Sequence, residues 1–159
     1  MNYIKITKND IANGNGVRVV LWVAGCDCHC PGCHNPETWD FEAGQKFDDA
    51  AKQELFAALA KPHIQGLTLS GGHPLAANNR YACEQLLKEV KQKFPNKDVW
   101  VYTGYTYEGI KKINSSILQY IDVLVDGPYV AEQRDITLAF RGSRNQRIIK
   151  LNKGEMENE

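Results

Sequence analysis

Short apolar runs alternate with helical patterns along most of this chain of 159 residues, and this alternation limits the folds that it can adopt. Residues 17–24, 66–70, 98–102 and 121–125 have the composition of strands, and residues 146–151 form a fifth such run. Strands that alternate with helices build βα units around a parallel sheet. The pattern therefore predicts an α/β fold with a mostly parallel sheet.

Two of the intervening segments have the apolar spacing of amphipathic helices. The first starts near Asp48, and the second is placed so that Asn78 or Asn79 caps it. A shorter helix is expected at residues 107–113. The apolar positions are Phe47, Ala51, Leu55, Phe56 and Leu59 in the first helix and Cys83, Leu86, Leu87, Val90 and Phe94 in the second. Cys83 is therefore predicted to lie in the core.

The amino-acid composition limits how many domains the chain can form and which kinds of partner it can bind. With 43% hydrophobic and 24% charged residues, the chain is predicted to form one domain at residues 1–151, followed by a polar, frayed tail at residues 152–159. Lys and Arg number 19, as do Asp and Glu, and no basic run stands out, so neither nucleic acid nor a membrane is an expected partner. The sequence shows no secretory signal or membrane-spanning stretch, which predicts a cytoplasmic protein.

Three cysteines follow the first predicted strand in the spacing C-x3-C-x2-C: Cys26, Cys30 and Cys33. Iron–sulfur clusters are held by cysteine thiolates, normally four for a 4Fe-4S cluster. A loop that supplies three thiolates leaves one iron without a protein ligand, and an open position distinguishes catalytic from structural metal centres. The spacing therefore predicts a catalytic cluster. It is similar to the motif of the S-adenosylmethionine (SAM) radical enzymes, in which the open iron binds SAM.

A fourth thiol, Cys28, lies inside the same loop and leaves other interpretations open. It could close an all-thiolate zinc or iron site or the cluster of a non-catalytic electron carrier, and His29 or His34 could also ligate a metal. Structural zinc sites usually draw two ligand pairs from separate segments, and the sequence has no second pair downstream. We therefore assign the cluster to Cys26, Cys30 and Cys33, with Cys28 as a spare thiol.

Glycine and polar residues follow the predicted strands at residues 70–74, 102–104 and 126–128. Ligands of such sheets bind beyond the carboxyl ends of the strands. Gly71 and Gly72 lack Cβ, which lets the backbone come close to a ligand, although a Gly-Gly pair is also an ordinary turn. Asp126 by itself would be an ordinary turn aspartate. The sequence predicts that a binding site collects on this rim.

Several further segments carry a resemblance that covers nearly the whole chain. They are N-G-N-G-V-R at residues 13–18, C-P-G-C-H-N at 30–35, L-S-G-G-H-P-L at 69–75, Y-T-G at 102–104, V-D-G-P-Y at 125–129 and R-G-S-R-N-Q-R at 141–147. Together with the cysteine spacing, these segments resemble those of the activating proteins of anaerobic ribonucleoside-triphosphate reductase, a small family of the SAM radical superfamily.

The resemblance implies a small partial (β/α) barrel of the SAM radical type and a specific activity. Cys26, Cys30 and Cys33 would hold a 4Fe-4S cluster whose fourth iron binds SAM. One electron from a flavodoxin-like or ferredoxin-like donor would cleave SAM, and the radical produced would take hydrogen from a backbone glycine of the large subunit of the reductase. The residues implied to contact SAM or to lie near it are Gly71, Gly72, His73, Asn13 and Asp126, with Gly14, Gly16 and Arg147 as further neighbours.

Two positions depart from the family pattern. An acidic residue usually follows the two glycines, where this chain has His73. A carboxylate accepts strongly from the SAM ammonium, whereas a neutral histidine offers one acceptor nitrogen, so His73 is expected to face the methionine end of SAM without a fixed negative charge. An aromatic residue usually follows the third cysteine, where this chain has His34.

A second small SAM radical enzyme, 7-carboxy-7-deazaguanine synthase, shares the cysteine spacing and acts on a small molecule. Residues 125–129 and 141–147 fit that enzyme poorly. SAM cleavage would separate both enzymes from an electron carrier, which needs no SAM site.

Overall fold

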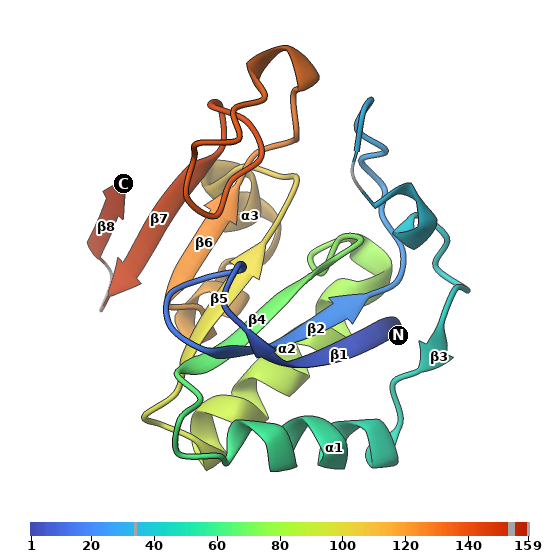
Figure 1. Ribbon diagram of the computed structural model, residues 1–159, viewed down its shortest axis with the longest axis vertical. Helices are drawn as coiled ribbons and strands as arrows, with labels where there is room; N and C mark the ends of the chain where they lie inside the picture. The colour runs from blue at the N-terminus through green and yellow to red at the C-terminus, as the bar shows by residue number, and fades with distance from the viewer. Residues whose placement is uncertain (34, 153–154, 159) are drawn as a thin grey trace.

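The computed structural model describes residues 1–33, 35–152 and 155–158, and in these ranges eight strands form one sheet (Figure 1). The strand order is β3-β1-β2-β4-β5-β6-β7-β8. The strands are β1 (Asn2–Asp10), β2 (Arg18–Val23), β3 (Gln45–Lys46), β4 (Gly66–Gly71), β5 (Asp98–Tyr102), β6 (Val123–Asp126), β7 (Arg147–Asn152) and β8 (Glu155–Asn158).

The α/β prediction is confirmed, but the sheet is parallel only in its centre. Strands β2, β4, β5 and β6 run parallel, whereas β1 and β3 on one side and β7 and β8 on the other are antiparallel. Strand β1 has no counterpart in the predicted pattern, because Lys and Asn interrupt its apolar residues. Within the described ranges the sheet does not close, so the barrel that the resemblance implies is not confirmed.

The predicted helices are present. They are α1 (Asp49–Leu59), α2 (Ala77–Lys93) and α3 (Tyr107–Asn114), with short 3-10 helices at Pro36–Thr38, Ser115–Tyr120 and Ala131–Gln133. Asp48 caps α1 by accepting from the Ala51 amide at 2.9 Å. The predicted capping of α2 by Asn78 or Asn79 is wrong, because α2 begins after Ala76 without a side-chain cap and Asn79 lies inside it. No described helix has both the length and the apolar character needed to cross a membrane.

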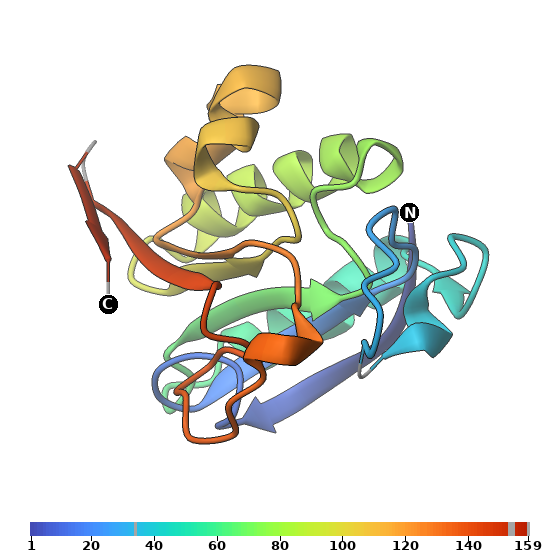
Figure 2. The ribbon, with the colours of Figure 1, turned by 90° about the horizontal axis from the view of Figure 1, so that it is seen from above.

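The two faces of the sheet differ in what covers them. All three α-helices pack on one face, where alternate side chains of the central strands, such as Leu21, Leu69 and Val101, join the main core with Cys83. Figure 2 shows α2 and α3 on this side and residues 127–146 on the other. The second face carries a smaller cluster around Trp100, with polar side chains beside it. The face without helices is therefore open to a ligand.

Two further predictions, on the C-terminal tail and on His34, have different outcomes. Residues 155–158 form β8 against β7, where the sequence predicts a frayed tail. His34, the expected replacement for an aromatic residue, lies outside the described residues.

Candidate metal and cofactor site

The carboxyl ends of the four parallel strands meet at one rim, as predicted. β2 leads into the cysteine loop, and the turns after β4, β5 and β6 lie beside it. A cavity of about 150 Å³ opens between these segments. The residues that line it are Cys26, Cys28, Cys30, Cys33, Ser70, Gly71, Gly72, His73, Tyr102, Thr103, Gly104, Gly127, Tyr129 and Gln146. All four cysteines of the loop thus face one space, together with the glycine turn.

Backbone contacts shape the cysteine loop. The Gly25 amide donates to Thr38 O at 2.6 Å, and the Cys26 amide donates to Trp39 O at 3.1 Å, so residues 38–39 hold the first part of the loop. Two thiols accept backbone amides: Cys26 Sγ from Cys28 and Cys33 Sγ from Asn35, each at 3.4 Å. Hydrogen bonds to the sulfurs are among the factors that set the potential of an iron–sulfur cluster.

The thiols of the loop differ in how readily they ionise. A hydrogen bond from Cys28 lowers the pKa of the Cys26 thiol well below its ordinary value, although burial opposes this. The same hydrogen bond, with burial, raises the pKa of Cys28, and burial raises that of Cys30. Cys26 is therefore the more acidic thiol of the pair. Cys83 is not part of this loop. It is completely buried in the core, and this burial raises the pKa of its thiol to about 12.

The donor set fits an iron–sulfur cluster. Thiolates are the ligands that such clusters require, and Cys26, Cys30 and Cys33 are half-buried on a loop that borders a cavity. The donor atoms that converge most closely are a different set, Cys26, Asp27, Cys28 and His73, which lie within 4.8 Å of one another. That spacing suits one ion rather than a cluster of four irons.

Neighbouring backbone atoms leave no room for a side chain at Gly71 or Gly72, independently of any ligand that the turn contacts. Gly71 has a φ of +103°, and a Cβ there would lie 2.6 Å from Val23 O. A Cβ on Gly72 would lie 2.4 Å from Gly25 O and 2.8 Å from Thr38 O. Both glycines therefore allow the turn after β4 to dock against the backbone that leads into the cysteine loop.

This contact gives a testable prediction for Gly72. Replacement by alanine should push the cysteine loop away from β4, at a cost of about 1–3 kcal/mol in the free energy of unfolding, and should lower the iron retained after reconstitution. Gly109→Ala, inside α3, is the matched control and should change stability by less than about 1 kcal/mol. Urea unfolding and iron analysis measure both quantities. Equal iron content in the two variants would contradict the assigned contact.

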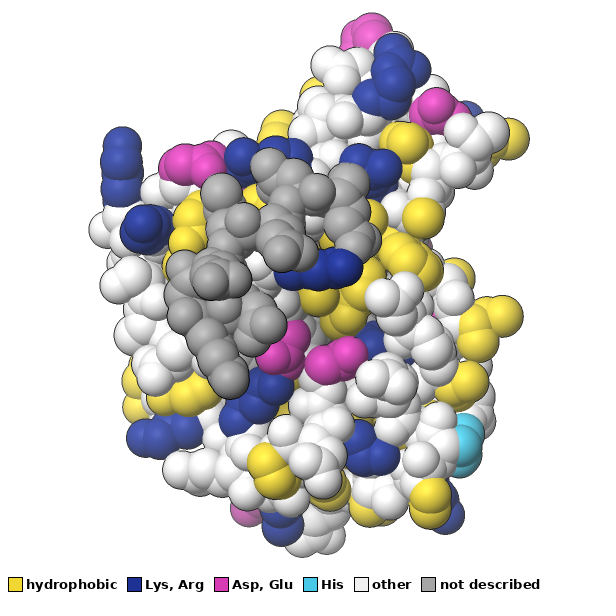
Figure 3. Space-filling model, turned by 90° about the vertical axis from the view of Figure 1, so that its left-hand side faces the viewer, with side chains coloured by type: hydrophobic (Ala, Val, Ile, Leu, Met, Phe, Trp, Pro, Cys, Tyr) yellow, Lys and Arg dark blue, Asp and Glu magenta, His cyan; other side chains and the backbone are white. Residues whose placement is uncertain are grey.

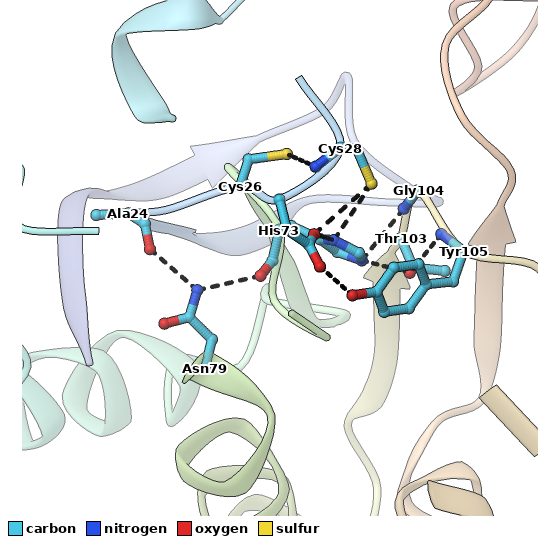
Figure 4. Close-up of polar contacts among 9 residues, drawn as sticks. Ala24, Cys26, Cys28, His73, Asn79, Thr103, Gly104 and Tyr105 are labelled. Carbon is cyan, nitrogen blue, oxygen red and sulfur yellow. Dashed lines mark hydrogen bonds and ion pairs between the residues drawn. The ribbon is translucent and has the colours of Figure 1, made fainter. Parts of the chain in front are cut away.

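His73 lies within the site, but its side chain is tied to protein groups. Its ring is 1% exposed, with Nδ1 2.7 Å from Asp27 Oδ1 and Nε2 2.7 Å from Thr103 Oγ1 (Figure 4). Tyr105 packs edge-on against the ring and donates its hydroxyl to Asp27. Both ring nitrogens are engaged with protein groups, so the ring joins the cysteine loop to the end of β5, and the contact of His73 with SAM stays a prediction.

Asn79, assigned to a helix cap from the sequence, belongs to the same region. Its Nδ2 donates to Ala24 O at 3.0 Å and to His73 O at 3.1 Å (Figure 4). The His73 amide in turn donates to Gly25 O at 2.6 Å. The first half of the cysteine loop is thus fixed to β4 and α2.

Asp126 and Arg147 pair with each other. Asp126 is 1% exposed, and its two oxygens accept Arg147 Nε at 3.0 Å and Nη2 at 2.5 Å. Asp126 also accepts from the Tyr107 amide at the start of α3, and Arg147 also contacts Glu108. These contacts join the ends of β6 and β7 to α3 and give Asp126 a structural role, while its contact with SAM stays a prediction. The adjacent Gly127 lines the cavity instead.

Asn13 lines a second, larger cavity of about 480 Å³ on the open face of the sheet. Its floor includes Trp22, Ser70 and Tyr102, and residues 134–142 form one wall. The two cavities adjoin, because Cys33, Ser70, Tyr102, Tyr129 and Gln146 line both. Figure 3 shows a hollow at the right of the surface with hydrophobic side chains on it. Sequence reasoning missed the wall at 134–142, although the motif at 141–147 borders it.

Arg18 holds the loop that carries Asn13. The Arg18 side chain is fully buried, and its Nη1 donates to Asn15 O at 2.9 Å while Nε donates to Thr68 Oγ1 at 2.8 Å. Thr68 Oγ1 donates to Asn13 O at 2.7 Å, and Arg18 Nη2 forms an ion pair with Asp98 Oδ1 at 2.6 Å. Arg18, at the start of β2, therefore helps to position Asn13 at the larger cavity.

Comparison with known proteins is consistent with this site. A family model described as a 4Fe-4S single cluster domain matches residues 12–149. Anaerobic ribonucleoside-triphosphate reductase-activating protein of Haemophilus influenzae is 44% identical over 150 residues, which cover 93% of this chain and 97% of that protein. The protein of the same name from Enterobacteria phage T4 is 46% identical over 148 residues, 93% of each chain. That of Escherichia coli K12 is 39% identical over 153 residues, 95% of this chain and 99% of the relative. The cysteine loop and the matched domain support an iron–sulfur cluster.

Proposed function

Since the chain belongs to the family of anaerobic ribonucleoside-triphosphate reductase-activating proteins, we propose that it generates the glycyl radical of that reductase. A 4Fe-4S cluster held by Cys26, Cys30 and Cys33 would supply the reductive cleavage of SAM that this reaction requires. The open face of the sheet would receive the glycine segment of the reductase.

The observation that carries the proposal is the joining of the two cavities at Cys33. The smaller cavity presents the thiols and the glycine turn, and the larger one extends from them across the open face of the sheet. A cofactor at the thiols would thus be reached by a second molecule from the larger cavity. An electron carrier has no need of that second space.

The residues of the chain would bind, orient and exclude water. Gly71 and Gly72 would lie along the methionine part of SAM, with Asn13 on the far side of the larger cavity. Trp22, Tyr102 and Phe140 supply aromatic walls in that cavity, which would exclude water from a reactive species. His73 and Asp126 would act indirectly, by holding the segments around the site.

The cavity wall at 134–142 explains why a partner protein is the proposed substrate. Ile136, 85% exposed, lies on this wall, and Ile11, 74% exposed, precedes Ala12, which lines the same cavity. An open, partly apolar mouth suits a peptide segment better than a small polar molecule. We propose the large subunit of the reductase as this partner because the relatives are named for its activation, and a flavodoxin-like or ferredoxin-like protein as the electron donor.

SAM cleavage is the experiment that tests this function against an electron carrier. Reduced, reconstituted protein is expected to release methionine and 5′-deoxyadenosine in equal amounts, and the Cys33→Ala variant should release neither. Liquid chromatography of the quenched reaction measures both products. Cys28 lines the cysteine cavity and favours the carrier, since it could close the cluster as a fourth ligand. If the protein carried a full cluster but did not cleave SAM, the result would contradict the proposed function and indicate an electron carrier.

A further inference from the structure

Cys28, the spare thiol of the loop, and His73, which stands where the family usually has an acidic residue, are neighbours in space. Cys28 Sγ lies 3.6 Å from His73 Nδ1 and 3.7 Å from Asp27 Oδ1. With Cys26 Sγ they form a group of four donor atoms, all within 4.8 Å of one another. The extra thiol and the unexpected histidine thus belong to one arrangement, which we call the inner donor set (Cys26, Asp27, Cys28 and His73; Figure 4).

We propose that the inner donor set binds a single divalent transition-metal ion in the cluster-free protein. Two thiolates, an imidazole and a carboxylate are ligands of Zn²⁺, and the same mixture suits Fe²⁺ or Co²⁺. With bonds of about 2.0–2.3 Å, the ligand atoms of a tetrahedral ion lie about 3.3–3.8 Å apart. The distances from Cys28 Sγ to the imidazole and the carboxylate fall in that range.

The surroundings support a ligand role for Nδ1 of His73. A histidine that ligates a metal through one nitrogen usually donates its other N–H to an oxygen, which fixes the ring. Nε2 of His73 lies 2.7 Å from Thr103 Oγ1 and accepts the Gly104 amide at 3.3 Å, so on ion binding the ring proton would move from Nδ1 to Nε2 and be donated to Thr103 Oγ1. Nδ1 lies 2.7 Å from Asp27 Oδ1, and an ion would replace the proton of this hydrogen bond. The ion can enter from the side of Asp27, whose side chain is 39% exposed.

The inner donor set and the three-cysteine cluster exclude each other, because both use Cys26. The single ion therefore belongs to the protein before the cluster is assembled or after it is lost. In that state the ion would keep the thiols of Cys26 and Cys28 ligated and shielded from oxidation, since the free thiolate is the species that oxidises. The proposal is independent of the reaction that the loaded protein performs.

Cobalt titration of the cluster-free protein without oxygen tests the proposal. One equivalent of Co²⁺ is expected to give thiolate charge-transfer bands and the strong visible bands of a tetrahedral ion. Cys28→Ala and His73→Gln should each weaken Co²⁺ binding at least about tenfold, and Thr103→Val, which removes the outer hydrogen bond to His73 together with the acceptor of the Tyr105 amide, about tenfold. Circular dichroism establishes that each variant is folded.

Cys30→Ala and Cys33→Ala are the matched controls, because they remove cluster ligands outside the inner donor set. They should bind Co²⁺ like the wild-type protein but assemble no cluster, whereas Cys28→Ala should assemble the cluster but bind Co²⁺ weakly. One equivalent of Zn²⁺ should slow cluster reconstitution in the wild type and not in Cys28→Ala. Cobalt bands that survive in Cys28→Ala and His73→Gln, or that disappear in Cys33→Ala, would overturn the proposal.

Discussion

Replacing Cys26, Cys30 or Cys33 singly by alanine is expected to reduce the iron of the reconstituted protein from about four atoms per chain to near zero. The loop has no other thiolate placed to compensate without rearrangement, because Cys28 is bound to Cys26, Asp27 and His73. Visible absorption and iron analysis after anaerobic reconstitution measure the effect.

Cys28→Ala and Cys83→Ala are the controls for the cluster assignment. Cys28→Ala removes a thiol that this account leaves outside the cluster, and Cys83→Ala removes one buried in the main core. Both variants should retain about four irons per chain. If Cys28→Ala lost the cluster and Cys26→Ala kept it, the ligand assignment would be wrong.

The second large effect is expected at Arg18. Arg18→Met removes a fully buried guanidinium and leaves Asp98 and the Asn15 carbonyl without this partner, while Thr68 keeps its hydrogen bond to Asn13 O. Removing one partner of a buried ion pair lowers the free energy of unfolding by about 3–5 kcal/mol. Because Asp98 is partly exposed, we expect a loss of about 3 kcal/mol for this variant. Urea unfolding should show this loss, and calorimetry should show weaker SAM binding, because the 13–16 loop loses the bond from Arg18 to Asn15 O and Asn13 is then held, among the described residues, only by Asp10 and Thr68.

Arg144→Ala controls for the loss of one positive charge. Arg144 is exposed, so its removal should change the free energy of unfolding by no more than about 0.5 kcal/mol. Equal stability of the Arg18 and Arg144 variants would show that the buried network does not support the 13–16 loop.

The central part of the fold could be predicted because its signals are local. Strands β2, β4, β5 and β6 are short apolar runs, and the face of α1 and α2 follows from apolar spacing. The rim then follows from the rule that ligands bind beyond the carboxyl ends of parallel strands. For the same reason Cys26, Cys30, Cys33 and the glycine turn could be assigned to one site.

The remaining features depend on contacts between distant residues. β1 and β7 pair antiparallel with their neighbours, which their own sequences do not reveal. Asp126 precedes a Gly-Pro turn at the rim, but its partner Arg147 is 21 residues away. His73 and Asp27 are 46 residues apart, and each by itself looks like a loop residue. The role of such a polar side chain depends on the residue with which it pairs. A single sequence does not show which residue that is.

We propose above that a partner protein completes the site and receives the radical. The most direct measurement is the electron paramagnetic resonance spectrum of reduced protein mixed with SAM and the cognate reductase in the absence of oxygen. A glycyl doublet is expected to grow in step with the release of methionine and 5′-deoxyadenosine, and it should be missing when Cys33→Ala replaces the wild type. Rapid SAM cleavage without a glycyl signal would contradict the account and point to a small-molecule substrate.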